Sequence, residues 1–320
     1  MRRTIWRVLW IPAIVGFVTA THLAPAEETV AQPKVILGGN TQTNTPTGST
    51  SAATQGVTAV SSRLDPNVLV TEAVADMPAS GGYRANSVAM VALRRSIQLG
   101  DSQLAINPDE ARPSFCSGAT YLIFLKVLNR LNHEGAIHLN DATFRALLVQ
   151  EDQADGVGAW GRWNANGPGT ARLFYETGMG VNFTSLADAR PGDFLKIFWN
   201  DEIGARESGH SVIYLGSETK AGGEYVRYWS SNVPSGFGVA EVPHQRIHRM
   251  LFSRLVRPDL VPQITTLPAR DPYLASMLKR SSSADEMQRM VGIGPSHGDS
   301  WFKRLLHLKS EPKNPAGVNQ

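Results

Sequence analysis

The segment CSGATYLIFLKVLNRL, residues 116–131, decides the fold class of this chain. Large apolar side chains recur along it at the spacing of one helix face: Tyr121, Phe124, Leu125 and Leu128. Further apolar residues fill much of the remaining helix surface, so the helix has little that it can expose to water. We therefore predict a deeply buried α-helix from Cys116 to about Leu131.

Short apolar runs separated by turns follow this helix and indicate β-strands. The runs are FLKIFW at 194–199, SVIYLG at 211–216 and YVRYWS at 225–230, and the turn PGD at 191–193 precedes the first. Asp193 is expected to serve the geometry of that turn. Hairpin-linked strands after a block of helices are typical of an α+β domain with an antiparallel sheet. We expect two further helices, from Val88 to Leu99 behind an Asn86 cap and from an Asn140 cap onward.

The two ends of the chain differ from its middle. Residues 1–26 have a basic opening, a short apolar run and the sequence LAPA, which together are typical of a cleaved signal peptide. An uncleaved membrane anchor is the alternative, and either reading places the protein outside the cytoplasm, in the periplasm or secreted. Residues 27–63 read as a flexible linker, residues 64–262 as the folded domain and residues 263–320 as a peripheral helical or irregular tail. Ser283 and Glu286 form a capping box for a helix in that tail.

The charge and cysteine content exclude several classes of protein. The chain has 31 basic and 28 acidic residues, and three of the basic ones lie in residues 1–26. Removal of that segment leaves as many acids as bases, so the high isoelectric point does not indicate a nucleic-acid partner. One cysteine, Cys116, excludes a disulfide framework and any zinc site that needs two thiolates. No later segment is apolar enough for a stable membrane span.

Cys116 lies in the first turn of the predicted buried helix, where the backbone favours a negative charge. The helix dipole and the free N–H groups lower the pKa of a thiol there, and they can also hold an oxyanion. A thiolate nucleophile needs a base, and His210 stands at the start of the second predicted strand. We therefore expect Cys116 and His210 to face each other as nucleophile and base.

A third residue should orient the imidazole of His210. The third predicted strand ends in Ser230, Ser231 and Asn232, and in an antiparallel hairpin its end lies beside the start of the second strand. Asn232 can accept a hydrogen bond from an imidazole N–H. Ser230 is the competitor, since it is two residues away and its side chain points to the same side.

These motifs resemble the NlpC-type papain-like cysteine peptidases and the related amidohydrolases of the CHAP type. The resemblance covers roughly residues 85–255 and rests on FCSG at 115–118, ARPGDF at 189–194 and GHSVIYLG at 209–216. It implies a papain-like fold and cleavage of amide bonds in peptidoglycan peptides, without a metal or organic cofactor. The chain departs from the family in having Phe115 where an aspartate is usual, and in the long separation of Asn232 from His210. We assign no residue before Cys116 to the tyrosine that assists the oxyanion in many members.

Other readings and signals remain open at this level. The same fold could be a catalytically idle module that binds cell wall or a protein, or the Cys–His pair could serve a protease or acyltransferase. Trp160 and Trp163 lie in a segment, residues 156–169, that we predict to be a glycine-rich loop; they could form a groove wall or anchor an insertion in the core, and the sequence favours neither. His244 and His248 have helical spacing, but a solvated turn is expected because no further ligand accompanies them. The oligomeric state does not follow from the sequence.

Overall fold

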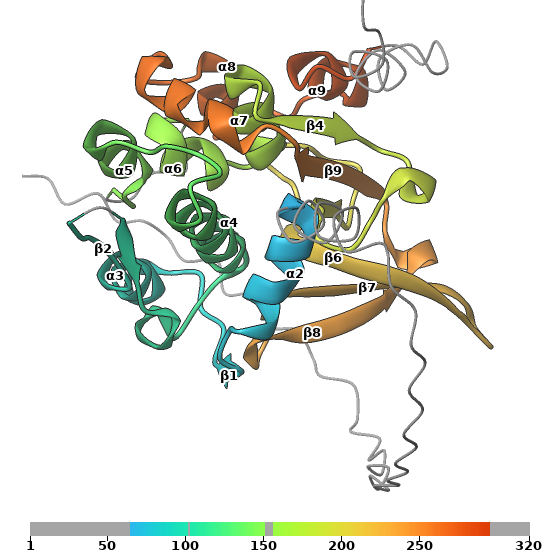
Figure 1. The fold of residues 1–320 in the computed structure, drawn as a ribbon. Coiled ribbons are helices and arrows are strands. Elements are labelled where there is room, and N and C mark those ends of the chain that lie inside the picture. Colours follow the sequence, from blue (N-terminus) through green and yellow to red (C-terminus); the bar gives the residue numbers. More distant parts are fainter. Residues whose placement is uncertain (1–64, 102, 151–155, 295–320) are drawn as a thin grey trace, which may run out of the picture. The chain divides into compact units, whose positions relative to one another are not determined.

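The computed structural model describes residues 65–101, 103–150 and 156–294, and these residues form an α+β fold (Figure 1). The proposed signal peptide, the linker and residues 295–320 of the tail lie outside this range. The helices of the described residues are α2 Pro66–Ala75, α3 Ser87–Arg95, α4 Cys116–His133, α5 Asp141–Leu147, α6 Gly158–Trp163, α7 Gly169–Thr177, α8 Pro272–Ser276 and α9 Ala284–Met290. Short 3₁₀ helices span Pro108–Ala111, Leu186–Asp188, His244–Arg246 and Pro258–Thr266.

A seven-stranded sheet with the order β1-β8-β7-β6-β5-β9-β4 forms the other half of the fold, and its paired strands are antiparallel. Its strands are β1 Ser80–Gly81, β4 Gly180–Phe183, β5 Phe194–Phe198, β6 Gly209–Lys220, β7 Gly223–Asn232, β8 Gly236–Pro243 and β9 Arg249–Leu255. The three predicted strands are confirmed as β5, β6 and β7, although β6 and β7 are longer than expected. The sequence analysis did not predict the other four, of which β9 is the partner of β5 on the side away from β6.

The predicted buried helix is confirmed as α4, which packs against β6 and β7. Figure 1 shows α4 between α3 and α5 on one side and the sheet on the other. Its apolar side chains share one core with Phe194, Ile213 and Trp229 of the sheet. Because the helix is enclosed on several sides, the position of its first residue, Cys116, is set by tertiary packing rather than by the loop that precedes it.

One predicted helix and one predicted loop need correction. The helix expected at Val88–Leu99 ends at Arg95, because Ile97–Leu99 is instead strand β2, paired with β3 Leu104–Ile106. The Asn86 cap is confirmed: its side-chain oxygen accepts from the N–H groups of Val88 and Ala89 at 3.1 and 3.3 Å. The glycine- and tryptophan-rich segment is the helix α6 rather than a loop.

Both tryptophans of α6 are buried, which decides between the two readings of that segment. Trp160 and Trp163 are each 1% exposed and belong to the same core as α4. They anchor the insertion in the core and present no exposed ring surface as the wall of an open groove. Each lies within a cluster of aromatic rings that includes Tyr121 of α4, at centroid distances of 5.0 and 5.2 Å.

Residues 263–294, which we expected to form part of a peripheral tail, pack against the domain. Leu274 and Met287 are completely buried, and the buried Asp271 accepts a hydrogen bond from Arg172 of α7 at 2.8 Å. The helix behind the capping box is confirmed as α9, where the Ser283 hydroxyl accepts from the N–H of Glu286 at 3.1 Å. Apolar residues are sparse in this segment, which is why we expected a peripheral tail. A few large buried side chains and one buried ion pair are nevertheless sufficient to attach it to the domain.

Asp193 does more than shape a turn. Its buried carboxylate accepts from Nε and Nη2 of Arg254, both at 2.7 Å, and from the amide of Asn67 at 2.9 Å. It also accepts from the N–H of Arg190 at 2.8 Å, which is the expected turn contact. The carboxylate therefore links α2, the start of β5 and β9.

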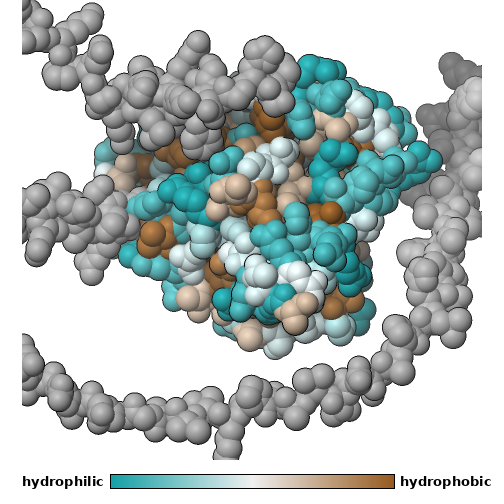
Figure 2. Space-filling model, turned by 90° about the vertical axis from the view of Figure 1, so that its right-hand side faces the viewer, coloured by the Kyte–Doolittle hydropathy of each residue, from teal (hydrophilic) through white to brown (hydrophobic). Residues whose placement is uncertain are grey.

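The described helices fall short of what a membrane span requires. None of the helices in the described part of the chain combines the length and hydropathy that a membrane span requires. On the face drawn in Figure 2, hydrophobic residues form small patches separated by hydrophilic ones. Scattered apolar residues of this kind are usual on a water-exposed surface.

Candidate functional site

Cys116 is the first residue of α4, and no side chain caps the start of that helix. The N-cap residue is Phe115, whose side chain accepts no hydrogen bond from the helix. The first backbone N–H groups of α4 are thus not satisfied by a capping side chain, and they concentrate partial positive charge around the thiol. Cys116 as a residue is half-buried, at the boundary between the core and the surface.

His210 meets this thiol at a place where two strands of the sheet separate. The register between β6 and β7 begins at Ile213 and Trp229, so the first residues of β6 are not paired with β7. The backbone N–H of Ser211 and the side chain of His210 both hydrogen-bond to the sulfur of Cys116. The first residues of β6 therefore contact the start of α4 and are not paired with β7.

Asn232, the last residue of β7, holds the other side of the imidazole. Its Oδ1 lies 3.1 Å from Nε2 of His210. Its Nδ2 donates to the carbonyl oxygens of Gly238 at 2.8 Å and Ser230 at 3.4 Å, which determines the orientation of the amide. Because Oδ1 can only accept, Nε2 of His210 carries the proton in this hydrogen bond. Nδ1 is then the nitrogen that can take the proton of the thiol.

Ser230, the competing candidate, directs its hydroxyl to the backbone of Ser211. Its hydroxyl donates to the carbonyl oxygen of Ser211 at 2.7 Å, and its side chain is completely buried. Ser230 thus ties β7 to the start of β6, which lies outside the register between these two strands. The structure brings Cys116, His210 and Asn232 together in one row and leaves Ser230 beside it.

The pKa of the Cys116 thiol is lowered from its ordinary value to about 7. Burial by itself raises this pKa, since it disfavours the thiolate. The hydrogen bond and the charge of His210, with the backbone N–H of Ser211, outweigh burial. A large fraction of the thiol is therefore ionised at neutral pH, which is the state in which cysteine is a nucleophile.

Tyr83 is a site residue that the sequence analysis missed. Its hydroxyl hydrogen-bonds to the Cys116 sulfur, and the pKa of the phenol is raised to about 12 by burial, by the thiolate charge and by this hydrogen bond. An isolated bridge between Tyr83 and Ser114 places the tyrosine beside the chain that leads into α4, and its N–H donates to the carbonyl of Pro234 at 3.0 Å. A protonated phenol here is a second donor for a negatively charged oxygen, besides the N–H groups of α4.

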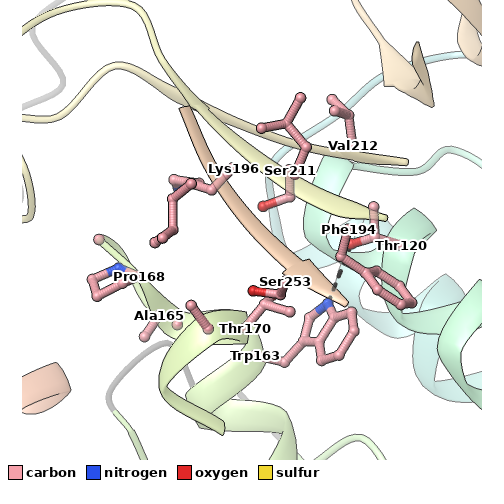
Figure 3. A pocket seen from close by; sticks show the side chains of 15 residues that line it. Thr120, Trp163, Ala165, Pro168, Thr170, Phe194, Lys196, Ser211, Val212 and Ser253 are labelled. Atoms are coloured by element: carbon pink, nitrogen blue, oxygen red, sulfur yellow. Dashed lines mark hydrogen bonds between the residues drawn. The ribbon is translucent and has the colours of Figure 1, made fainter. Parts of the chain in front are cut away.

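Aromatic side chains support both partners of the pair. The rings of Trp199 and Tyr228 lie 6.5 and 5.7 Å from the His210 ring. On the helix side, Nε1 of Trp163 donates to the carbonyl of Ser117 at 3.1 Å and to Thr120 at 3.2 Å, and the second of these bonds is drawn in Figure 3. Packing of this kind restricts the motion of the Cys116 helix and of the imidazole.

The remaining histidine pair takes no part in this site. Nδ1 of His244 lies 3.4 Å from a carboxylate oxygen of Glu224, and both side chains are exposed. Among the described residues, no cluster of three or more His, Cys, Asp or Glu side chains could hold a metal ion.

Comparisons with protein-family models, with curated proteins and with solved structures found no match to this chain.

Proposed function

We propose that this protein is an exported cysteine hydrolase with a papain-like fold that cleaves amide bonds in peptidoglycan peptides. The row of Cys116, His210 and Asn232 carries the proposal, because it combines an ionised thiol at a helix start with a base of defined tautomer. The helix packed against an antiparallel sheet, with the cysteine on the helix and the histidine on a strand, supports the papain-like assignment. The resemblance of the three sequence motifs supports the substrate class.

The reaction would begin with the thiolate of Cys116 attacking the carbonyl carbon of the scissile amide. The carbonyl oxygen would gain negative charge and accept hydrogen bonds from the N–H groups at the start of α4 and from the Tyr83 hydroxyl. His210, protonated at Nδ1 by the thiol, would give that proton to the leaving amine as the C–N bond breaks. Water, deprotonated by His210, would then attack the thioester and release the acid and free Cys116.

The test is the release of peptide fragments from purified cell-wall material. We expect the wild-type protein to liberate new amino groups, and mass spectrometry of the fragments to identify the cleaved bond. Cys116→Ala should release none, whereas Ser230→Ala, which removes a neighbouring hydroxyl outside the row, should retain activity. Release by Cys116→Ala at the wild-type rate would contradict the proposal.

The second candidate is a catalytically idle module of the same fold, which Phe115 in the place of the usual aspartate favours. The two candidates differ in whether Cys116 reacts with the cell wall or the protein only binds it. An idle module should bind cell wall and release no product, and Cys116→Ala should bind it as well as the wild type does. A Cys–His pair acting on proteins or transferring the acyl group to an amine would differ from the hydrolase in its products.

The assignment to an exported protein rests on residues 1–26. We expect the mature protein to begin at Glu27, as measured by its intact mass after expression with the full leader. An uncleaved anchor would instead retain the mass of residues 1–26.

A further inference from the structure

A second charged pair lies beside the Cys116 site and has no part in the mechanism above. Nζ of Lys196, on β5, is 2.6 Å from Oε1 of Glu207, and the two side chains are only 16% and 5% exposed. In the register of β5 and β6, Lys196 stands directly opposite Ser211, whose N–H faces the thiol. The lysine is thus on the strand next to the one that carries His210.

Gly209, the residue before His210, explains how the lysine reaches this position. A side chain there would be impossible without displacement, because a Cβ atom would lie 2.9 Å from both Cε and Nζ of Lys196. The ammonium group therefore passes over the bare backbone of Gly209. It lies beside the start of β6, next to the imidazole-bearing residue.

Glu207 is held in place independently of the lysine. Its Oε2 accepts from the N–H groups of Gly167 at 2.5 Å and Gly204 at 2.9 Å. Two backbone donors thus stabilise the carboxylate in addition to the ammonium. Replacement of Lys196 should leave Glu207 and both loops anchored, so a change in charge at this position can be separated from a collapse of the loops.

Lys196 shares a small cavity with the helix that carries the thiol. Lys196, Ser211 and Thr120 line a common cavity with a volume of about 20 Å³, which is room for about one water molecule (Figure 3). Thr120 lies one turn after Cys116 in α4, and its hydroxyl lies 3.3 Å from the carbonyl oxygen of Cys116. Charges in such a place are screened far less than charges at the surface.

We infer that the positive charge of Lys196 stabilises the Cys116 thiolate, and that the negative charge of Glu207 weakens this stabilisation. The charged and titratable groups that face the thiol are then His210 from β6, Tyr83 from the segment before α3 and Lys196 from β5. The charge of Lys196 lowers the pKa of Cys116, in agreement with this inference. The inference rests on the proposed Cys–His pair, but it requires neither hydrolysis nor a particular substrate.

The experiment measures the rate at which iodoacetamide labels Cys116 as a function of pH, and the midpoint of that curve reports ionisation of the thiol. Lys196→Met should move the midpoint upward, so that labelling at acid pH slows about three- to tenfold, since one pKa unit corresponds to a tenfold change in thiolate. Glu207→Gln leaves the ammonium uncompensated and should move the midpoint downward. Lys196→Arg, which keeps the charge, should stay near the wild-type curve.

A matched control removes the same charge elsewhere on the neighbouring strand. Lys220, at the far end of β6, is 38% exposed and pairs with Glu241, so Lys220→Met should leave the midpoint unchanged. Opposite shifts for Lys196→Met and Glu207→Gln would support an electrostatic role. Shifts in the same direction, or no shift in Lys196→Met, would overturn it. If the ion pair were purely structural, loss of either partner would disturb the local structure and change the midpoint in the same direction.

This readout also separates the inference from the proposed function. If cell-wall material is not cleaved but the opposite shifts are observed, the charge effect stands and the substrate assignment fails. If cleavage is observed and the midpoints do not move, the hydrolase stands and the role of Lys196 is wrong. Melting curves of each variant show whether it is folded, and Glu207→Gln still tests the inference should Lys196→Met not fold.

Discussion

Oδ1 of Asn232 accepts a hydrogen bond from Nε2 of His210 at 3.1 Å, across a separation of 22 residues in the chain. The amide can do so in one orientation because its nitrogen is occupied by the carbonyl oxygens of Gly238 and Ser230. This contact fixes the imidazole tautomer and leaves Nδ1 for the thiol of Cys116. The relationship between these two residues is what makes the site suited to base catalysis.

Replacement of Asn232 by alanine should lower kcat/KM by about 10- to 150-fold, the range that corresponds to a hydrogen bond with a charged partner. The loss arises because the imidazolium that forms during attack loses its acceptor. Hydrolysis of cell-wall peptides measures the effect. Ser230→Ala is the control on the same strand, two residues away, and an equal loss in both variants would contradict the assignment of Asn232.

The thiol should ionise with a midpoint near pH 7, which iodoacetamide labelling across pH 5–10 measures directly. Below that pH the thiol is protonated and labelling slows; above it the rate reaches a plateau. His210→Ala removes both the hydrogen bond and the charge that lower the pKa of the thiol, and it leaves the burial that raises this pKa. The midpoint of the labelling curve should therefore move upward, beyond the ordinary range of a free cysteine. A midpoint that is the same in His210→Ala and in the wild type would show that the imidazole does not contact the sulfur in solution.

Tyr83→Phe removes one hydroxyl next to the reacting sulfur and keeps the ring that packs there. We expect kcat to fall by about 100-fold, the size reported by loss of a single oxyanion donor, with little change in KM. Steady-state kinetics on a soluble peptide fragment give the two constants separately. An unchanged kcat would mean that the phenol hydroxyl serves packing or thiol solvation rather than the transition state.

The buried pair of Asp193 and Arg254 should be important for stability. Asp193→Ala leaves the guanidinium of Arg254 buried without its partner, and such a loss costs about 3–5 kcal/mol of unfolding free energy. Urea denaturation measures the change. Asp259→Ala is the matched control, because it breaks an Arg–Asp pair of the same 2.7 Å length at the surface, and there we expect little or no effect. Similar losses in both variants would contradict the role given to the Asp193 pair.

Several features of the site could be predicted because they depend on neighbours in the chain. The apolar periodicity after Cys116 requires a buried helix, and the alternation of turns and apolar runs requires hairpins. Together they place the cysteine at a helix start and His210 at a strand start. Asn86, Asn140 and Ser283 were recognised as caps because capping is a contact within a few residues.

The sequence by itself therefore determined the elements that carry Cys116, His210 and Asn232 and the residue types at their ends, since local periodicity reports which side of an element is buried. Tertiary structure decided what each buried or active side chain meets. A backbone β-bridge between Tyr83 and Ser114 places the tyrosine so that its hydroxyl reaches the sulfur. Asn232 rather than Ser230 reaches His210 because the last residues of β7 lie outside the register with the first residues of β6. The reason is physical: periodicity is a property of one element, whereas a contact between two elements depends on how both are packed against all the others.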